Sequence, residues 1–391
     1  MNSKNICLVT EEFRPSLKGG IATWSTELVN YLNKQNFEIT VFLKKRGGIN
    51  KSFNIKNLPY KIILINGRDW AYFKKWYVKR AIFGYLRNHK KPIIFSTNWE
   101  LSQGIVCFKK YFKFSLITIM HGLEITRLGS KKYKNRIKSF NNTISLSDKV
   151  ISVSNYTKDK AKSFLNNEKE IDVIPNFANM DSFYPIHSKN LRKNYNLKSS
   201  DIVILSLSRL TKRKGHFISI DTIKKLTKKY SNIKYLIAGT GDIAYEKKLK
   251  TYVKKHNLDS YIYFLGYVRE NHKNEIYNLC DIYIMTSLPM DMYGSSEGFG
   301  ITFLEANACG KPVIGTDVGG ISDAIQNGYN GFLIKPNNLL ELEKTIIKII
   351  NNKKLYKSLS ENSINHIKKD FDIKLVGKRY DMIINELYDS L

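Results

Sequence analysis

Two carboxylates lie close together in the segment EGFGITFLEANACGKPVIG, residues 297–315. Glu297 precedes a Gly-Phe-Gly turn, and a helix is expected to begin near Gly300. Glu305 stands among apolar residues of that helix, where burying a carboxylate is costly unless donors satisfy its oxygens. Adjacent hydroxyls of a ribose would do so, and a polyol would offer hydroxyls to Glu297. The pair therefore favours binding of a sugar.

Two cations follow an expected strand at 202–208. Arg209 and Lys214 are five positions apart, and such a pair can bracket a diphosphate, the guanidinium as a fork and the ammonium as a point charge. In a chain with a net charge of +30, a solvated basic turn is the more common explanation of this motif alone. A lone histidine such as His121 is also more often structural, but its position at the end of an apolar strand favours a ligand crevice.

Glycine motifs follow two further expected strands. Gly19 and Gly20 precede a helix and would present free N–H groups and the positive end of the helix dipole to a phosphate. Gly239 lies in the motif AGTGD, residues 238–242. Each motif alone is more often a tight turn, because a full dinucleotide fingerprint needs more residues. The argument therefore depends on several motifs together.

The residues above require strands that end at a common edge. Continuously apolar, β-rich runs separated by helix-length segments are typical of parallel sheets covered on both faces. Two series of such runs predict an α/β protein of two doubly wound domains, which bind ligands at the carboxyl ends of their strands. The runs are 5–10, 38–43, 61–65, 92–97, 116–122 and 150–154, then 202–208, 233–241, 261–266, 282–287, 312–316 and 331–336.

The boundary between the domains is expected within 179–200, which lacks a β-branched run. We expect a first domain over residues 1–180, a linker over 181–197 and a second domain over 198–371. The last segment, 372–391, has the pattern of an amphipathic helix.

Taken together, these motifs resemble the retaining glycosyltransferases of family 4, which have the GT-B fold. The resemblance covers nearly the whole chain, and Arg-x4-Lys followed by Glu-x7-Glu with Gly-Phe-Gly is its most specific part. It implies two Rossmann-like domains that face a central cleft, with the final helix crossing back to the first domain. Further matching segments are GGIA (19–22), HG (121–122), VSNYTKD (153–159), VIPNFANMDSF (173–183) and GGISDAIQNGYNGFLI (319–334).

The resemblance implies a role for each matching residue. Arg209 and Lys214 would hold the donor diphosphate and offset charge on the leaving group, and His121 would contact the donor sugar. Glu297 would hold the transferred sugar, and Glu305 the ribose hydroxyls. The expected catalytic residues are thus His121, Arg209, Lys214 and Glu297. The expected donor-binding residues are Gly19, Gly20, Gly239, Val268, Phe299, Gly300, Ile301 and Glu305.

The implied reaction moves a hexose-type sugar from a UDP- or GDP-sugar to an acceptor hydroxyl, with retention of configuration. The acceptor would be a lipid-linked or polysaccharide intermediate in cell-surface glycan biosynthesis. No metal or other cofactor is expected, since the Asp-x-Asp at 370–372 is better explained as a helix cap. The loop 286–300 is longer than in many relatives, so the donor sugar is the least defined inference. The alternatives are a nucleotide-sugar epimerase of the same fold and a transferase acting on a small soluble acceptor.

The segment 66–92 combines eight Lys or Arg with seven aromatic residues and one acid. Trp, Phe and Lys mixed on one helix suit an anionic membrane interface. The first domain could then reach a lipid-linked acceptor from the inner leaflet. A core-packed helix with a solvated basic face explains the same composition equally well.

Composition and charge exclude several classes of protein. The chain of 391 residues is 42% hydrophobic and 25% charged, as expected of a soluble enzyme with two domains. Its four cysteines are scattered and indicate a reducing compartment. No run approaches the ~20 apolar residues of a membrane span, and no signal peptide is recognised. A cytoplasmic location, with peripheral membrane contact as an option, is expected. No nucleic-acid-binding signature accompanies the positive charge.

Overall fold

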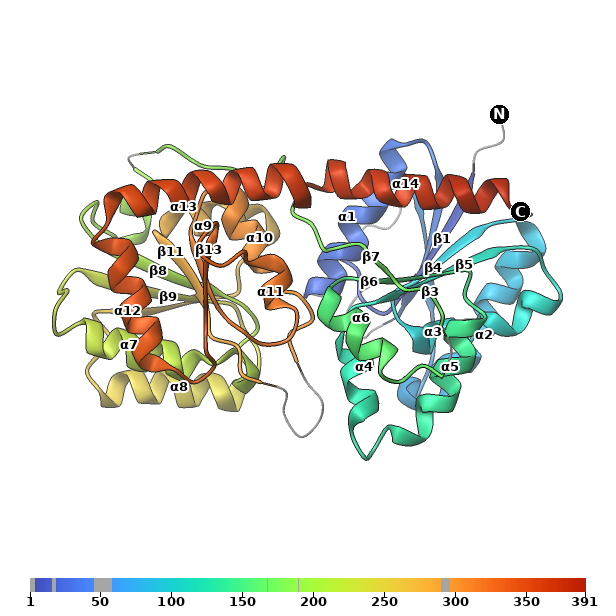
Figure 1. Ribbon diagram of the computed structural model, residues 1–391, viewed down its shortest axis with the longest axis horizontal. Coiled ribbons are helices and arrows are strands. Elements are labelled where there is room, and N and C mark those ends of the chain that lie inside the picture. Colours follow the sequence, from blue (N-terminus) through green and yellow to red (C-terminus); the bar gives the residue numbers. More distant parts are fainter. Residues whose placement is uncertain (1–3, 16–18, 46–57, 167, 189, 290–295) are drawn as a thin grey trace. The chain divides into compact units, whose positions relative to one another are not determined.

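The computed structural model describes residues 4–391 except 16–18, 46–57, 167, 189 and 290–295. It divides into two compact units, each with its own parallel sheet (Figure 1). The first unit is Met1–Asn176 with Ile373–Leu391, and the second is Phe177–Asp372. Among the helices of the described ranges, none is long and apolar enough to cross a bilayer.

The first unit is built on a seven-stranded sheet in the order β3-β2-β1-β4-β5-β6-β7, with every pairing parallel. The short β7 is the one described strand of this sheet that has no counterpart among the expected runs. Its strands are β1 (Asn5–Thr10), β2 (Glu38–Lys44), β3 (Lys61–Ile65), β4 (Ile93–Ser96), β5 (Ser115–Met120), β6 (Lys149–Ser152) and β7 (Asp172–Val173). Its α-helices are α1 (Gly20–Lys34), α2 (Trp70–Asn88), α3 (Trp99–Ser102), α4 (Leu123–Thr126), α5 (Ile137–Ser145), α6 (Asn155–Lys162) and α14 (Ile373–Asp389).

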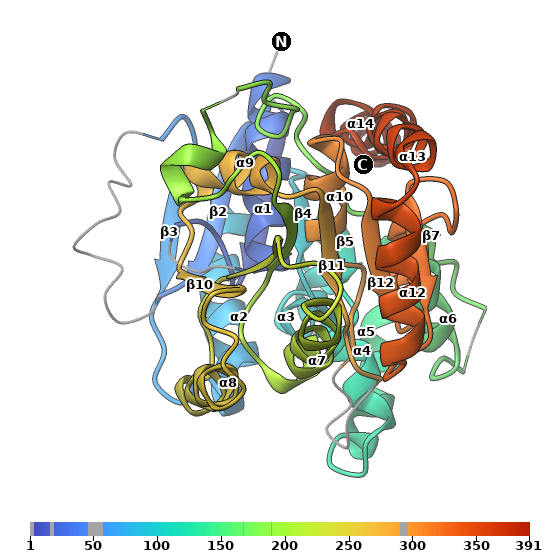
Figure 2. The same cartoon turned by 90° about the vertical axis from the view of Figure 1, so that its left-hand side faces the viewer.

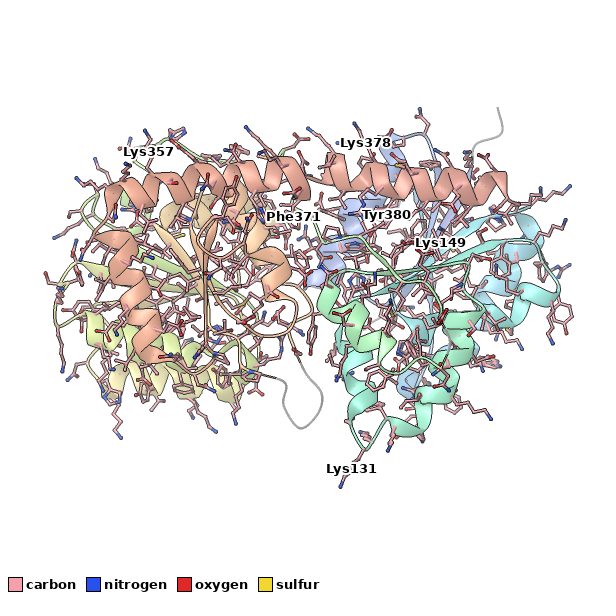
Figure 3. All side chains as sticks on the ribbon, in the orientation of Figure 1. Lys131, Lys149, Lys357, Phe371, Lys378 and Tyr380 are labelled. Atoms are coloured by element: carbon pink, nitrogen blue, oxygen red, sulfur yellow. The ribbon has the colours of Figure 1, made fainter. Side chains whose placement is uncertain are left out.

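The C-terminal helix α14 returns to the first unit and lies against α1 (Figure 1). Its inner side buries Tyr380, whose ring packs edge-on to Trp24 at a centroid distance of 6.1 Å (Figure 3). The hydroxyl of Tyr31 on α1 donates to Asp381 Oδ2 at 2.5 Å. The apolar side of the expected amphipathic helix therefore packs on the first unit, against α1 and β4.

The second unit contains a six-stranded parallel sheet in the order β10-β9-β8-β11-β12-β13. Helices cover both of its faces (Figure 2). Its strands are β8 (Ile202–Leu207), β9 (Ile233–Ala238), β10 (Ile262–Gly266), β11 (Ile282–Met285), β12 (Val313–Thr316) and β13 (Gly331–Ile334). Its α-helices are α7 (His216–Leu226), α8 (Ile243–Lys255), α9 (Glu270–Leu279), α10 (Ile301–Ala308), α11 (Ile321–Ala324), α12 (Leu339–Ile350) and α13 (Lys353–His366).

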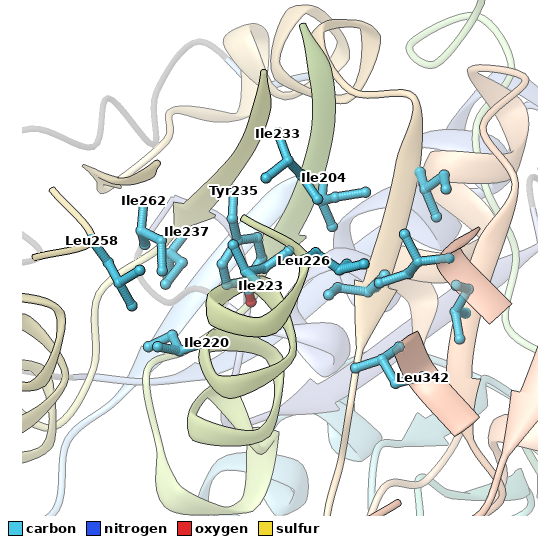
Figure 4. Packing of buried hydrophobic residues seen from close by; sticks show 14 of the residues in the cluster. Ile204, Ile220, Ile223, Leu226, Ile233, Tyr235, Ile237, Leu258, Ile262 and Leu342 are labelled. Carbon is cyan, nitrogen blue, oxygen red and sulfur yellow. The ribbon is translucent and has the colours of Figure 1, made fainter. Parts of the chain in front are cut away.

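A core of branched aliphatic residues fixes one layer of the second unit. Ile204 of β8, Ile223 of α7 and Leu342 of α12 are all fully buried in it (Figure 4). Because β-branched side chains on the strands meet aliphatic stripes on the helices, the sheet is apolar on this face. The strand ends that carry polar residues are thereby held in place.

Residues 181–197, expected to be a linker, belong to the second unit. The backbone N–H of Tyr184 donates to Asn274 Oδ1 at 3.0 Å, and Arg192 pairs with Asp281 at 2.7 Å. These contacts hold the segment against α9 and the start of β11. A segment without regular secondary structure can thus be packed against a domain through its polar groups.

A glycine on α14 provides a test of how closely this helix is fitted to the first unit. A Cβ at Gly377 would lie 2.5 Å from the Tyr31 ring, whereas a Cβ at Gly84 on α2 meets no described atom within 4 Å. We expect Gly377→Ala to lower the free energy of unfolding by about 1–3 kcal/mol through overpacking. Gly84→Ala should raise it by about 0.4–1 kcal/mol, because the unfolded chain loses freedom.

All four tryptophans, Trp24, Trp70, Trp76 and Trp99, belong to the first unit. Urea unfolding followed by tryptophan fluorescence therefore reports on this unit. Equal effects of the two substitutions would contradict the close fit of α14.

Candidate active site

A buried carboxylate held by two cations is the centre of the candidate site in the second unit. Lys214 Nζ donates to Glu297 Oε2 at 2.7 Å, and Arg213 Nη1 donates to the same oxygen at 2.5 Å. The side chains of Glu297, Lys214 and Arg213 are 12%, 10% and 17% exposed. We call these three residues the Glu297 clamp. The cations lie in the turn after β8, and Glu297 lies in the loop before α10.

Burial and charge act against each other in the Glu297 clamp. Burial raises the pKa of Glu297, but Lys214 and Arg213 outweigh this effect and lower that pKa to about 2. Burial also lowers the pKa of Lys214 to about 8, with Glu297 opposing the shift and Arg213 and Arg209 adding to it. Glu297 is therefore ionised at neutral pH, and Lys214 loses its proton far more readily than an ordinary lysine.

Two glycines allow the backbone around the clamp to come together. Gly319, after β12, has a φ of 60°, and a Cβ there would lie 2.1 Å from the Glu297 carbonyl oxygen. Gly320 N–H donates to that oxygen at 2.9 Å. Gly215 has a φ of 69°, and its Cβ would lie 1.8 Å from Thr286 O. A side chain at either position would push the clamp apart.

The second carboxylate of the pair is bonded to the neighbouring helix. Glu305 is 1% exposed on α10, and Tyr277 of α9 donates to its Oε2 at 2.6 Å. Lys273, one turn earlier on α9, places Nζ 3.4 Å from Oε1. Burial raises the pKa of the Tyr277 hydroxyl, and the nearby Glu305 carboxylate raises it further. A carboxylate has about four acceptor positions, so these contacts leave capacity for further donors.

In the first unit, a histidine follows β5 in a largely apolar setting. His121 packs edge-on to Trp24 at a centroid distance of 4.9 Å, and burial lowers its pKa to about 3. Its Nε2 has no hydrogen-bond partner among the described residues. Glu124 accepts from the N–H groups of His121 and Gly122 at 2.6 and 3.3 Å. Burial raises the pKa of Glu124 to about 7, against these hydrogen bonds.

The structure brings together some of the predicted site residues. Glu297 contacts Lys214, Arg213 completes the clamp, and Arg209 is exposed beside it. Gly300 is the N-cap residue of α10, so the expected helix start is confirmed. In the second unit lie Arg209, Lys214, Gly239, Val268, Glu297, Phe299, Gly300, Ile301 and Glu305; His121, Gly19 and Gly20 belong to the first unit.

Sequence reasoning missed three residues of the site. Arg213 precedes Lys214 in a run of three cations, and this run is the signal that the sequence offers for it. Lys273 and Tyr277 are four positions apart and so share one face of α9. A lysine on the buried side of a helix signals an acidic partner, but it does not identify Glu305. Within the described ranges, no group of three or more His, Cys, Asp or Glu side chains could hold a metal ion.

Two doubly wound units with polar residues at the ends of their strands have the arrangement in which α/β proteins bind ligands at the strand termini. Comparison with known families agrees. The family described as Glycosyltransferase Family 4 matches residues 18–182, and Glycosyl transferases group 1 matches residues 187–366. The chain belongs to this family of glycosyltransferases.

Two curated relatives match along much of their length. An uncharacterized glycosyltransferase of Methanocaldococcus jannaschii is 29% identical over 378 residues, covering 95% of each chain. The N-acetyl-alpha-D-glucosaminyl L-malate synthase of Bacillus anthracis is 25% identical over 279 residues, covering 71% of this chain and 69% of that protein.

Two solved structures establish the fold. Sucrose-phosphate synthase of Thermosynechococcus elongatus matches with a TM-score of 0.86 at 18% identity, covering 99% of this chain and 100% of the other. Anabaena HepE, in complex with UDP and glucose, matches with a TM-score of 0.79 at 18% identity, covering 97% and 99%. The protein therefore has the GT-B fold with two Rossmann-like domains.

The charge balance of the clamp predicts how stability changes with pH. The pKa of Glu297 is about 2 in the folded state, against 4.5 for an ordinary glutamate such as that of the unfolded chain. The ionised carboxylate therefore stabilises the fold fully above pH 4.5, and this stabilisation is lost as the pH falls toward 2. At neutral pH, Glu297→Gln should lower the free energy of unfolding by about 3 kcal/mol, because it leaves two cations without their partner.

The measurement is urea unfolding of wild type and variant, followed by far-UV circular dichroism between pH 7 and about pH 3. The difference between the two proteins should shrink as the pH falls. Glu361→Gln, in a pair with both side chains over 60% exposed, is the control and should change stability by less than about 0.5 kcal/mol. A difference that does not depend on pH would contradict the assigned role of the Glu297 charge.

Proposed function

We propose that the protein transfers a hexose-type sugar from a UDP- or GDP-sugar to an acceptor hydroxyl, with retention of configuration and without a metal. The acceptor is a lipid-linked or polysaccharide intermediate of cell-surface glycan biosynthesis, reached from the cytoplasmic side of the membrane. The observation that carries the proposal is the Glu297 clamp, a built anion site at the end of β8 with Glu305 on the adjoining helix.

The charges around the clamp match a nucleotide diphosphate. Arg209, Arg213 and Lys214 supply three positive charges, and Glu297 compensates one of them. These four side chains thus have two positive charges in excess, and a nucleotide sugar carries one negative charge on each of its two phosphates. Donor binding would draw the cations toward the diphosphate and free Glu297 to accept from sugar hydroxyls. Glu305 would accept from the ribose hydroxyls with the capacity that Tyr277 and Lys273 leave.

The proposed reaction replaces one bond of the anomeric carbon with another on the same face. The bond to the diphosphate oxygen breaks, a bond to the acceptor oxygen forms, and the acceptor proton passes to the departing phosphate. Lys214, Arg213 and Arg209 stabilise the negative charge that develops on the diphosphate. Three side-chain cations at this position support transfer without a metal ion.

His121 would take part as a neutral hydrogen-bonding group. Because burial lowers its pKa to about 3, the imidazole is uncharged at neutral pH and is a weak base. Its Nε2, without a partner among the described residues, would contact a hydroxyl of the donor sugar. This role orients the sugar and requires no proton transfer.

Two relatives bear on the identity of the donor and of the acceptor. HepE was solved with UDP and glucose, in agreement with a nucleotide-sugar donor. The Bacillus anthracis relative is named as a synthase that joins a glucosaminyl group to L-malate, and this favours a small soluble acceptor as the second candidate. A nucleotide-sugar epimerase, which needs no acceptor, is a further alternative.

Donor binding tests the proposal directly. In a thermal-shift or calorimetric panel of nucleotide diphosphates and their sugars without metal, one UDP- or GDP-sugar should bind most tightly. Lys214→Ala and Arg213→Gln should each lower the affinity for that donor by about 10- to 100-fold, because each removes a charge-assisted hydrogen bond. Glu305→Ala should abolish binding, whereas Lys250→Ala on α8, whose partner is Glu246, should have no effect. Equal affinity in wild type and Lys214→Ala would contradict the site.

Product analysis tests the reaction. NMR of the glycoside formed should show the anomeric configuration of the donor, and the rate should be unchanged by EDTA. Inversion, or activity restored only by a divalent ion, would refute the mechanism. Conversion of the donor sugar without any acceptor would instead identify an epimerase, and transfer to L-malate in preference to lipid-linked glycans would select the soluble acceptor.

A further inference from the structure

The outer face of α2 is aromatic and basic at once. Four large aromatic residues are exposed on it, and Tyr111 is exposed on the segment beside it. The exposed fractions are 87% for Tyr72, 55% for Phe73, 53% for Trp76, 44% for Phe83 and 77% for Tyr111. We call these five residues and the exposed cations around them the α2 surface.

The core does not require these aromatic side chains. The opposite side of α2 already buries Val78, Ile82, Tyr85 and Leu86 in the core of the first unit. A helix that only packed on a core would have a polar outer face. The alternative drawn from the sequence was a core-packed helix with a solvated basic face. The structure has the core-packed inner face, but packing in the core does not explain the exposed aromatic residues of the outer face.

Contacts between rings make the α2 surface continuous with the next segment. Phe83 stacks on Phe108 at a centroid distance of 5.8 Å and meets Phe112 edge-on at 6.1 Å. Tyr111 therefore lies beside the C-terminal half of α2. Of the eight exposed large aromatic residues of the described chain, five belong to this one surface. Single exposed apolar residues need no explanation, but a cluster marks an interaction site.

The charge of the α2 surface has one sign. Residues 70–91 and 101–113 contain no Asp or Glu. Lys74 and Lys109 are neutralised by acids from other segments. Two of the remaining cations lie over exposed rings, Arg80 over Trp76 and Arg87 over Phe83, each at 5.8 Å. The exposed cations are Lys75, Lys79, Arg80, Arg87, Lys90, Lys91, Lys110 and Lys113.

We propose that the α2 surface docks the protein on an anionic lipid bilayer. Lys and Arg would bind lipid phosphates, and Trp76, Phe73 and Tyr72 would enter the interface between head groups and acyl chains. A bilayer offers both environments at the same depth over its whole surface, so a row of aromatic side chains among cations can enter it without a matched pocket. The absence of acids from these segments removes repulsion from the negative lipids.

The same helix is anchored to the strand ends of the first sheet. On its inner side Trp70 bonds to Glu11, which follows β1, and Lys74 bonds to Glu100, which follows β4, at 2.6 Å. The outer face of α2 therefore has a fixed position relative to those strand ends. Given the proposed function, a membrane held at α2 would present the sugar of a lipid-linked acceptor to this edge of the first unit.

Vesicle binding of the full chain tests the proposal. The probe is a vesicle of phosphatidylcholine with about one third phosphatidylglycerol, compared with pure phosphatidylcholine. We expect salt-sensitive binding to the anionic vesicle with a blue shift of tryptophan emission. The triple variant Lys75→Gln, Lys79→Gln, Arg80→Gln should weaken binding about 100-fold, since each charge near the surface contributes about fivefold. Phe73→Ser with Trp76→Ser should weaken it at least tenfold.

The matched control removes the same charge from another exposed helix. Lys247→Gln, Lys248→Gln, Lys254→Gln on α8 should change vesicle affinity by less than about twofold, since these side chains are outside the α2 surface. If wild type does not bind, if the α8 control loses as much affinity as the α2 triple variant, or if a random oligonucleotide binds more tightly than the vesicle, the proposal is wrong. Thermal unfolding confirms that each variant is folded.

A further variant separates this proposal from the proposed function. Glu297→Gln should bind vesicles as wild type does, because Glu297 belongs to the other unit. Vesicle binding without any glycosyl transfer would leave the α2 surface standing and overturn the proposed function. Transfer to a polysaccharide acceptor without vesicle binding would overturn the membrane role of the α2 surface and leave the proposed function standing.

Discussion

The second unit is organised around the cost of burying the Glu297 carboxylate. Without Lys214 and Arg213 the ionised group would be expelled or neutralised, and with them it is held ionised at 12% exposure. This pairing requires the turn after β8 and the loop before α10 to approach within hydrogen-bond distance. Gly215 and Gly319 stand where backbones meet at distances that forbid a Cβ. The close approach that the Glu297 clamp requires thus explains why glycine occupies positions 215 and 319.

Much of the fold could be predicted from the sequence, because parallel strands buried on both faces are continuous apolar runs. Twelve runs were expected, and each overlaps one of the strands β1–β6 or β8–β13. The two-residue β7 carries no such pattern. The packing of residues 181–197 carries no such pattern either, because its contacts are made by Arg192 and single backbone groups, which hydrophobic periodicity does not report.

The candidate site was predictable only in part. The sequence singled out Lys214 because it follows a strand, Glu297 because it precedes a helix, and Glu305 because it is a carboxylate among apolar residues of that helix. The partners of Arg213 and Tyr277 could not be read from the sequence, since they lie 84 and 28 residues away. The resemblance to known glycosyltransferases did not point to Arg213 or Tyr277 either, because the cations of its motif are Arg209 and Lys214. Contacts between elements, rather than motifs within one, set the electrostatics here.

The two faces of α2 show where composition stops being informative. In 66–92 the sequence permits a core helix or a membrane helix, and counting charges cannot separate them. The structure assigns Val78 and Ile82 to the core and Tyr72 and Trp76 to solvent, so the aromatic content is shared between two environments. Exposing indole and phenol rings to water costs free energy that folding does not recover. A partner that covers them and tolerates the surrounding cations must be both apolar and anionic, which describes the surface of a lipid bilayer with acidic head groups.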